Sequence, residues 1–240
     1  MTSAAYGVCR SLFEPMVRQR VRIRFGKSGN LKYIGHKDLM RSFESLFRRA
    51  RLPLAMSGGF HPKIRMSLPS ALALGVEGFD EVLELEINES AGMVDPTTLL
   101  TDLNRCSVKG LDFYSIRQLD EQETKAKLAS STFEFIVPKE LRSQTVNQVS
   151  SFLSAESVIA EKSNGKSVDV RAATCELQYS QETGLLTVEI LTQNGPEAGI
   201  REILQVLGLE KELFKNIFPK RTRCRLTNDP TENHTEDRLV

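Results

Sequence analysis

The chain has 240 residues, of which 40% are hydrophobic and 26% are charged, a composition typical of a globular protein and not of a disordered one. No segment approaches the roughly 18 apolar residues that cross a bilayer, and Met1–Gly7 shows no basic segment before an apolar run, so neither a membrane span nor a secretory signal is predicted. The formal net charge of +1 excludes a uniformly basic or acidic chain.

Charge is nevertheless distributed unevenly along the sequence. Between Arg10 and Arg65 there are 14 Lys and Arg residues against three acids, whereas the rest of the chain holds 18 bases and 28 acids. The N-terminal third is therefore strongly basic and is expected to attract a polyanion such as nucleic acid.

In chain order, the N-terminal part predicts the succession β-α-β-β-α-β, which is typical of a ferredoxin-like unit. Residues Val21–Phe25 alternate between apolar and basic side chains, as in a half-buried strand. Residues His36–Ala50 place apolar side chains at helical spacing, and Pro53 follows the end of this helix. The other expected elements are a loop over 57–62, strands over 63–68 and 81–87, a helix from Asp95, and a strand over 111–117.

A polar stretch over 119–131 predicts a linker, and a related succession of elements follows it. These elements are strands over 133–137, 158–161, 167–171, 175–179 and 185–191, helices over 140–153 and 197–207, and a final basic segment over 220–225.

The predicted fold class is therefore α+β with two ferredoxin-like units in tandem. The expected parts are a flexible leader (1–20), a basic N-terminal domain (21–118), a C-terminal α/β domain (132–226) and a disordered tail (227–240).

This doubled order is faintly similar to the scaffold of tRNA pseudouridine synthases, which need an aspartate in a loop shortly after the first helix. The corresponding loop, 57–63, contains no Asp. The similarity therefore favours RNA binding without that chemistry.

Basic side chains gather on the polar face of the helix over 36–50 and on either side of it. Such a set can neutralise phosphates, although a solvated helix face that keeps the protein soluble explains the helix residues equally well. The candidate nucleic-acid contacts are Arg22, Arg24, Lys27, Lys32, Arg41, Arg48, Arg49, Lys63 and Arg65.

Two residues at the start of that helix are candidates for catalysis. Asp38 complements the helix dipole in the first turn, or it is a functional carboxylate among arginines. His36 is a helix-capping residue or a general acid/base. The sequence leaves these alternatives open.

The loop Ser57-Gly58-Gly59-Phe60-His61-Pro62 combines conformational freedom with an aromatic ring. Two glycines allow a close approach to a ligand, Phe60 can stack on a base, and His61 can contact a phosphate or a base edge. The same composition also suits a tight turn that packs on the core.

Several sites are not predicted. The four cysteines are scattered and form no C-x-x-C pair, which indicates reduced thiols in a cytoplasmic protein. No phosphate loop, dinucleotide-binding fingerprint, H-E-x-x-H or G-x-S-x-G motif occurs. The expectation is that the chain holds neither a cofactor nor a metal, and whether it is an enzyme stays open.

The segments Phe25–Arg41, Arg48–Ala50, Leu52–Ala55 and Ser57–Pro62 resemble the radical-SAM-linked domain family of unknown function. The likeness is specific over residues 21–90 and covers His36, Asp38, Arg41, Glu44, Arg48, Arg49, Ser57, Gly59, Phe60, Pro62 and Lys63. Gly35 departs from the family pattern, which has Ser there. The resemblance implies a context of RNA or tRNA modification beside a radical SAM protein, and it implies no particular reaction.

Three hypotheses follow. The first is an accessory factor that binds structured, tRNA-like RNA. The second is an RNA-modifying enzyme that uses Asp38 and His36 as acid/base groups. The third is a docking module for an acidic radical SAM partner.

Overall fold

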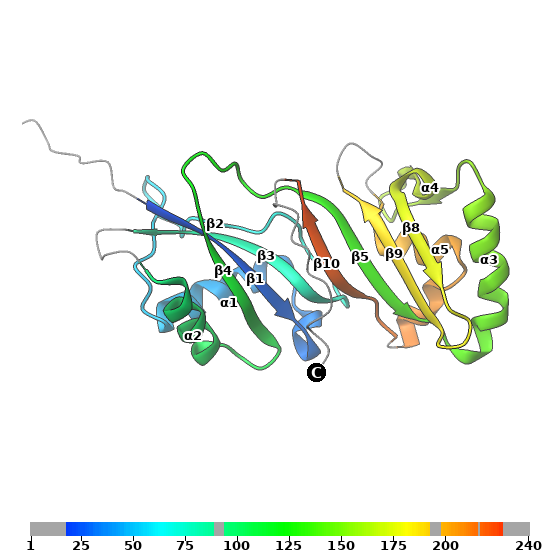
Figure 1. The fold of residues 1–240 in the computed structure, drawn as a ribbon, viewed down its shortest axis with the longest axis horizontal. Helices are drawn as coiled ribbons and strands as arrows, with labels where there is room; N and C mark the ends of the chain where they lie inside the picture. The colour runs from blue at the N-terminus through cyan, green and yellow to red at the C-terminus, as the bar shows by residue number, and fades with distance from the viewer. Residues whose placement is uncertain (1–17, 89–93, 193–197, 216, 228–240) are drawn as a thin grey trace, which may run out of the picture.

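The computed structural model describes residues 18–88, 94–192, 198–215 and 217–227. A mixed eight-stranded sheet runs along the length of the molecule (Figure 1), in the order β4-β1-β3-β10-β5-β9-β8, with β2 beside β3. The chain is thus α+β, as predicted. In the part of the chain described, no helix is long and apolar enough to cross a membrane.

The element bounds are as follows. The sheet strands are β1 (Arg18–Lys27), β2 (Met66–Ser67), β3 (Glu77–Asn88), β4 (Leu111–Leu119), β5 (Leu128–Ile136), β8 (Thr174–Tyr179), β9 (Leu185–Leu191) and β10 (Lys220–Leu226). A separate hairpin pairs β6 (Ile159–Glu161) with β7 (Ser167–Asp169). The helices are α1 (His36–Arg49), α2 (Pro96–Cys106), α3 (Arg142–Ser154), α4 (Val170–Ala173) and α5 (Ile200–Val206), with shorter helical turns η1 (Gly29–Tyr33), η3 (Lys139–Leu141) and η4 (Glu210–Lys215).

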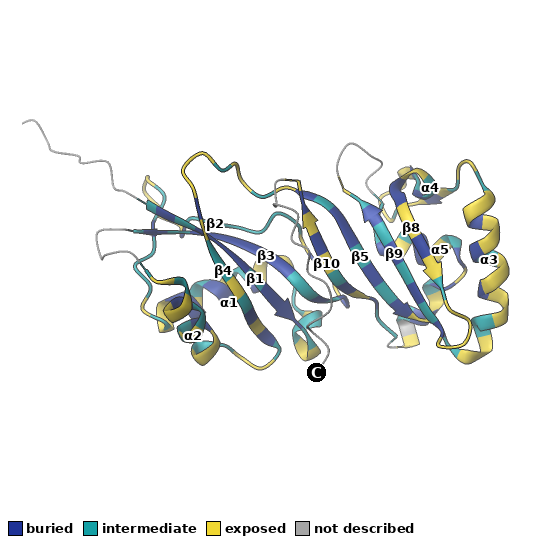
Figure 2. Ribbon diagram, in the orientation of Figure 1, coloured by how far each residue is buried: buried dark blue, intermediate teal, exposed yellow. Residues whose placement is uncertain are grey.

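The N-terminal half follows the predicted periodicities closely. The apolar residues Val21, Ile23 and Phe25 of β1 are buried, and α1 turns its apolar stripe onto the sheet, so that strand and helix share one core with α2 and β4. The strand is more buried than the predicted half-buried one, because Arg22 and Gly26 on its other face are buried as well. Figure 2 shows the buried strands against the exposed outer faces of the helices. The apolar residues of β1 and α1 in this core are Val21, Ile23, Phe25, Leu39, Phe43, Leu46 and Phe47.

The C-terminal half has a second core between β5, β8 and β9 and the helices α3 and α5. Its last strand, β10, pairs antiparallel with β5 and parallel with β3, through Lys220 opposite Glu77 and Arg221 opposite Gly78. A strand more than 130 residues distant in sequence therefore joins the sheets of the two halves into one.

Several element boundaries differ from the predicted ones. Strand β1 begins at Arg18, inside the predicted leader, and the connection between the halves is 120–127, shorter than the predicted 119–131 because β4 and β5 extend into it. Residues 1–17 and 228–240, which include nearly all of the predicted leader and tail, lie outside the described residues.

Two predicted strands are shorter than expected for local reasons. The strand over 63–68 is reduced to β2, because the residues before it belong to the stem of a hairpin. The strand over 167–171 ends at Asp169, whose carboxylate accepts hydrogen bonds from the backbone N–H groups of Arg171 and Ala172 and so starts α4. The helix over 140–153 is confirmed as η3 and α3, and the helix over 197–207 as the shorter α5.

The connection 120–127 is fastened to the face of the sheet opposite α1. Arg20 donates to the Glu123 carbonyl at 2.6 Å, and the backbone N–H of Ala126 donates to Glu84 at 3.0 Å. Arg117 and Glu123 form an ion pair at 2.7 Å. Hydrogen bonds from Arg117 lower the pKa of the Glu123 carboxyl to about 2, so the Arg117–Glu123 pair stays charged in mildly acidic solution.

Cleavage of this connection is expected to leave the two halves associated. After trypsin cuts at exposed Lys125, the C-terminal fragment still contributes β10 to the edge of β3. Denaturing gels should show two fragments, while native size-exclusion chromatography should show one particle. Separate elution of the two fragments without denaturant would contradict the continuous sheet.

Candidate functional site

The arginines of β1 face acids on the neighbouring strand. The register sets Arg22 opposite Glu84, and the two form a buried ion pair at 3.0 Å. Arg24 pairs with Asp80 at 3.1 Å. Because these charges are neutralised within the sheet, Arg22 and Arg24 are poorly placed to contact a phosphate.

Three more of the predicted cations also have intramolecular partners. Lys27 is 1% exposed and donates to the Ile34 carbonyl, and burial lowers the pKa of its ammonium although Glu81 opposes the shift. Lys32 lies over the rings of Tyr33 and Phe218, at 5.3 and 4.8 Å from their centroids. The remaining cation, Arg65, is 3.5 Å from Glu86.

The two candidate catalytic residues lie on an open surface at the start of α1. His36 is exposed, and the Asp38 side chain, 62% exposed, forms an ion pair with Arg41 at 3.2 Å. The N-cap residue is Gly35, which has no side chain to complete a capping box with Asp38.

The two ends of α1 carry different candidate residues. At 1.5 Å per residue, the 14 residues of α1 hold its ends about 20 Å apart. His36 and Asp38 are at one end and Arg48 and Arg49 at the other, so the structure does not unite all the predicted residues in one site.

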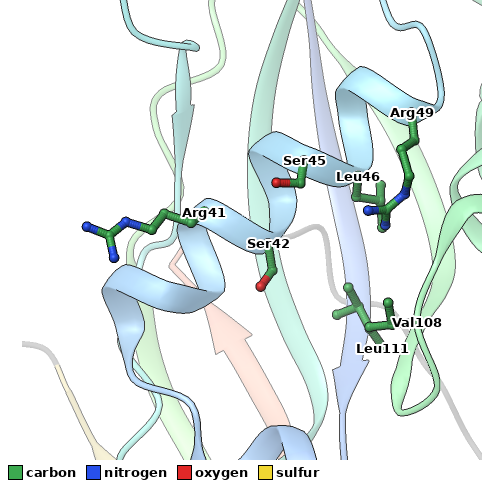
Figure 3. A pocket seen from close by; sticks show the side chains of 7 residues that line it. All are labelled: Arg41, Ser42, Ser45, Leu46, Arg49, Val108 and Leu111. Carbon is green, nitrogen blue, oxygen red and sulfur yellow. The ribbon is translucent and has the colours of Figure 1, made fainter.

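A shallow hollow of about 230 Å³ lies between α1 and the turn that leads into β4. Figure 3 shows Arg49 beside Leu46, whereas Arg41 points away from the other lining side chains. Arg49 donates to the carbonyl of Cys106 at 2.9 Å, so it fastens the end of α1 to the end of α2. The other lining residues are Ser42, Ser45, Val108 and Leu111.

Beyond the C-terminal end of α1, the chain forms a hairpin with residues 58–62 at its tip. The Ser57 N–H donates to the Lys63 carbonyl at 2.8 Å, and the Lys63 N–H donates back to the Ser57 hydroxyl at 2.9 Å. Below them, Met56 bridges to Ile64. Hydrogen bonds therefore close the base of the predicted loop, and its aromatic residue, Phe60, projects into solvent with a relative exposure of 103%.

Exposed basic residues lie on this hairpin and in the chain that leads to it from α1. We call Arg48 and Arg51, at the end of α1, together with Phe60, His61 and Lys63 of the hairpin, the hairpin-end surface. Within the described residues, the side chains of its four basic residues form no ion pair. They are therefore available to an external anion, in contrast to the arginines of β1.

Arg51 is not among the candidates predicted from the sequence, and the structure adds it. It has φ 55°, the left-handed conformation, at the position after the helix end where glycine is common. Sequence reveals its charge but not this conformation. Left-handed backbone costs an L-residue about 1–2 kcal/mol, so the chain keeps a cation here in a strained conformation.

The described residues offer little to other kinds of chemistry. Among them, no group of three or more His, Cys, Asp or Glu side chains is arranged to hold a metal ion. Cys106, Cys175 and Cys224 are free thiols, and burial raises the pKa of Cys224 to about 12. Cys9 lies outside the described residues.

Comparison with known proteins identifies a family for this chain. A search of curated proteins found no match. The family model described as "Uncharacterized protein conserved in bacteria (DUF2344)" matches residues 20–201, which include both the hairpin-end surface and most of the C-terminal half. The chain therefore belongs to this family of uncharacterized bacterial proteins (DUF2344).

Proposed function

We propose that this protein binds structured, tRNA-like RNA as an accessory factor in RNA modification or processing. The observation that carries the proposal is the hairpin-end surface, which combines a fully exposed aromatic ring with four exposed basic side chains that form no ion pair within the described residues. Cations provide sequence-independent affinity for phosphates, and exposed aromatic rings stack on bases.

The two other hypotheses have less support. The site around Asp38 and His36 is open, and Asp38 is already paired with Arg41, whereas catalytic acids and bases usually lie in concave, desolvated sites. A docking surface for an acidic radical SAM protein would use the same cations, but it gives no specific role to an aromatic ring raised on a hairpin.

We also propose that the two halves are ferredoxin-like units. Strand order supports this, because in each half the first strand lies between the last and the third (β4-β1-β3 and β10-β5-β9). A continuous sheet built from two such units is also similar to the scaffold of tRNA pseudouridine synthases.

A radical SAM protein is the proposed partner in this setting, on the strength of the sequence resemblance alone. Co-purification from cells that produce both proteins tests it. If RNA co-purifies with the protein but the radical SAM protein does not, RNA binding is supported and the proposed association with a radical SAM protein is wrong.

Removing two cations of the hairpin-end surface is expected to weaken tRNA binding regardless of tRNA sequence. For Arg48→Ala combined with Arg51→Gly, the slope of log affinity against log salt concentration should flatten by about 0.7–0.9 per lost phosphate contact. Filter binding of bulk tRNA at several salt concentrations measures this slope. Lys166→Ala, which removes an exposed cation in the C-terminal half, should leave the slope unchanged.

The same variants separate binding from folding. Arg51→Gly relieves a left-handed arginine and should stabilise the fold by about 1 kcal/mol in urea unfolding. Weaker binding by a more stable protein would assign the loss to the missing charge. If the variant binds tRNA as tightly as the original protein and with the same salt dependence, Arg48 and Arg51 do not contact phosphates and only keep the protein soluble.

A further inference from the structure

We infer that the hairpin tip stacks on an unpaired base, so that the protein selects RNA with exposed single-stranded nucleotides over fully paired RNA. The inference rests on the proposed RNA binding and specifies the substrate class of the same surface. Its starting point is Phe60, whose side chain contacts nothing that would shield it from water.

The hairpin that carries this ring has a stem held against the sheet. Its stem is fixed on β3, since Ala55 N–H donates to Glu86 O at 3.0 Å and Glu86 N–H donates to Arg65 O at 2.9 Å. Ala55 and Ile64 anchor the stem in the interior, with exposures of 1% and 8%. Because the stem is hydrogen-bonded to the sheet without a ligand, binding need not pay to order the stem.

The tip leaves room for a flat ligand beside the ring. Gly59 has φ 106°, a conformation that disfavours other residues, and a Cβ built on Gly58 or Gly59 meets no atom within 4 Å. The two residues before Phe60 therefore add no side chain between the ring and a planar group that approaches it.

Basic residues follow the ring along the same hairpin. His61 follows Phe60 directly and Lys63 lies two residues further on, whereas Arg48 and Arg51 precede the hairpin, at the end of α1. An aromatic ring next to basic side chains that form no ion pair within the described residues matches a base with its adjoining phosphates. A purely apolar partner would leave those charges unsatisfied.

Pairing decides which RNA can use this ring. Within a duplex each base is stacked between its neighbours, whereas loops, bulges and single-stranded ends offer free base faces. A blunt duplex can satisfy only the cations. The hairpin-end surface should therefore bind loops and ends more tightly than it binds a duplex with the same number of phosphates.

The test uses the full chain with two RNA probes of equal phosphate number, a stem-loop with an unpaired loop and a blunt duplex. Since base–aromatic stacking is worth about 1–3 kcal/mol per base and 1.4 kcal/mol is tenfold, Phe60→Ala should weaken stem-loop binding roughly 5- to 150-fold. Duplex binding should be unchanged. Phe60→Tyr should restore stem-loop binding, and 2-aminopurine in the loop should be quenched by the original protein but not by Phe60→Ala.

Two controls define what overturns the inference. Ile159→Ala removes another exposed apolar side chain (61% exposed) in the C-terminal half and should change neither probe. Phe60→Leu keeps an apolar side chain without a π face. If it binds the stem-loop as tightly as the original protein does, or if both probes bind equally, stacking is excluded.

Failure here is distinguishable from failure of the proposed function. If the protein binds both probes equally, and the Arg48 and Arg51 changes still flatten the salt dependence, the stacking inference is wrong but the proposed RNA binding stands. If the protein binds neither probe, both proposals are wrong. Capture of vesicles of mixed neutral and anionic lipid, abolished by Phe60→Ala, would assign the ring to a membrane surface instead.

Discussion

Removal of either partner of the Arg221–Glu81 ion pair is expected to destabilise the protein by about 3–5 kcal/mol, because it leaves an uncompensated charge in the interior. Both side chains are almost fully buried, at 4% and 6% exposure. The guanidinium Nε lies 2.7 Å from Glu81 Oε1, and its Nη1 lies 3.0 Å from the Ser70 hydroxyl.

The loss should be greatest when the acid is removed. Glu81→Ala leaves Arg221 buried near Lys27, a residue that is 1% exposed, and like charges in a desolvated site repel strongly. Glu81→Leu combined with Arg221→Met should recover most of the lost stability, since a buried pair exchanged for apolar groups of similar volume is often neutral.

Urea unfolding measures these values, and the exposed pair Asp102–Arg105 supplies the control. Its arginine is 72% exposed, so Asp102→Ala should cost at most about 0.5 kcal/mol. If Glu81→Ala costs no more than Asp102→Ala does, the two halves are not fastened through this pair in solution.

Truncation of a buried aromatic side chain is expected to be equally severe. Phe43 is fully buried, 5.1 Å between ring centroids from Phe25 and 5.9 Å from Phe47, with Phe113 at 6.3 Å. Phe43→Ala removes these contacts and leaves a cavity, so it should cost about 3–5 kcal/mol.

The same chemical change at Phe60 provides a matched control. Because that ring is exposed, Phe60→Ala should change the free energy of unfolding by no more than about 0.5 kcal/mol. Equal losses at the two positions, measured by urea unfolding, would mean that the hairpin tip packs against the protein. In that case Phe60 could not serve as a stacking platform.

Much of the N-terminal half can be read from the sequence, because its signals are local. The alternation over Val21–Phe25 and the helical spacing over His36–Ala50 each describe a face that must be buried, and β1 and α1 bury those faces. The α+β class and the loop over 57–62 follow from the same kind of reasoning, whereas the exposure of Phe60 was left open by the sequence.

The sequence does not show which of its basic residues are paired or buried after folding. The excess of bases up to Arg65 predicts one continuous basic surface, yet Arg22, Arg24 and Lys27 are neutralised or buried in the structure. The carboxylate partners of Arg22 and Arg24 come from the acid-rich strand β3, 62 and 56 residues later, and only the antiparallel pairing of the two strands brings them together.

By itself, the sequence determined the α+β class, the amphipathic elements of the first half and the presence of basic and aromatic residues near the hairpin. Tertiary structure decided which of those cations remain unpaired, that Arg51 belongs with them, and that β10 returns to join the two halves through a buried ion pair. The physical reason is range: periodicity and turn chemistry act within a few residues, whereas strand register, burial of charge and ion pairing depend on segments brought together only by folding.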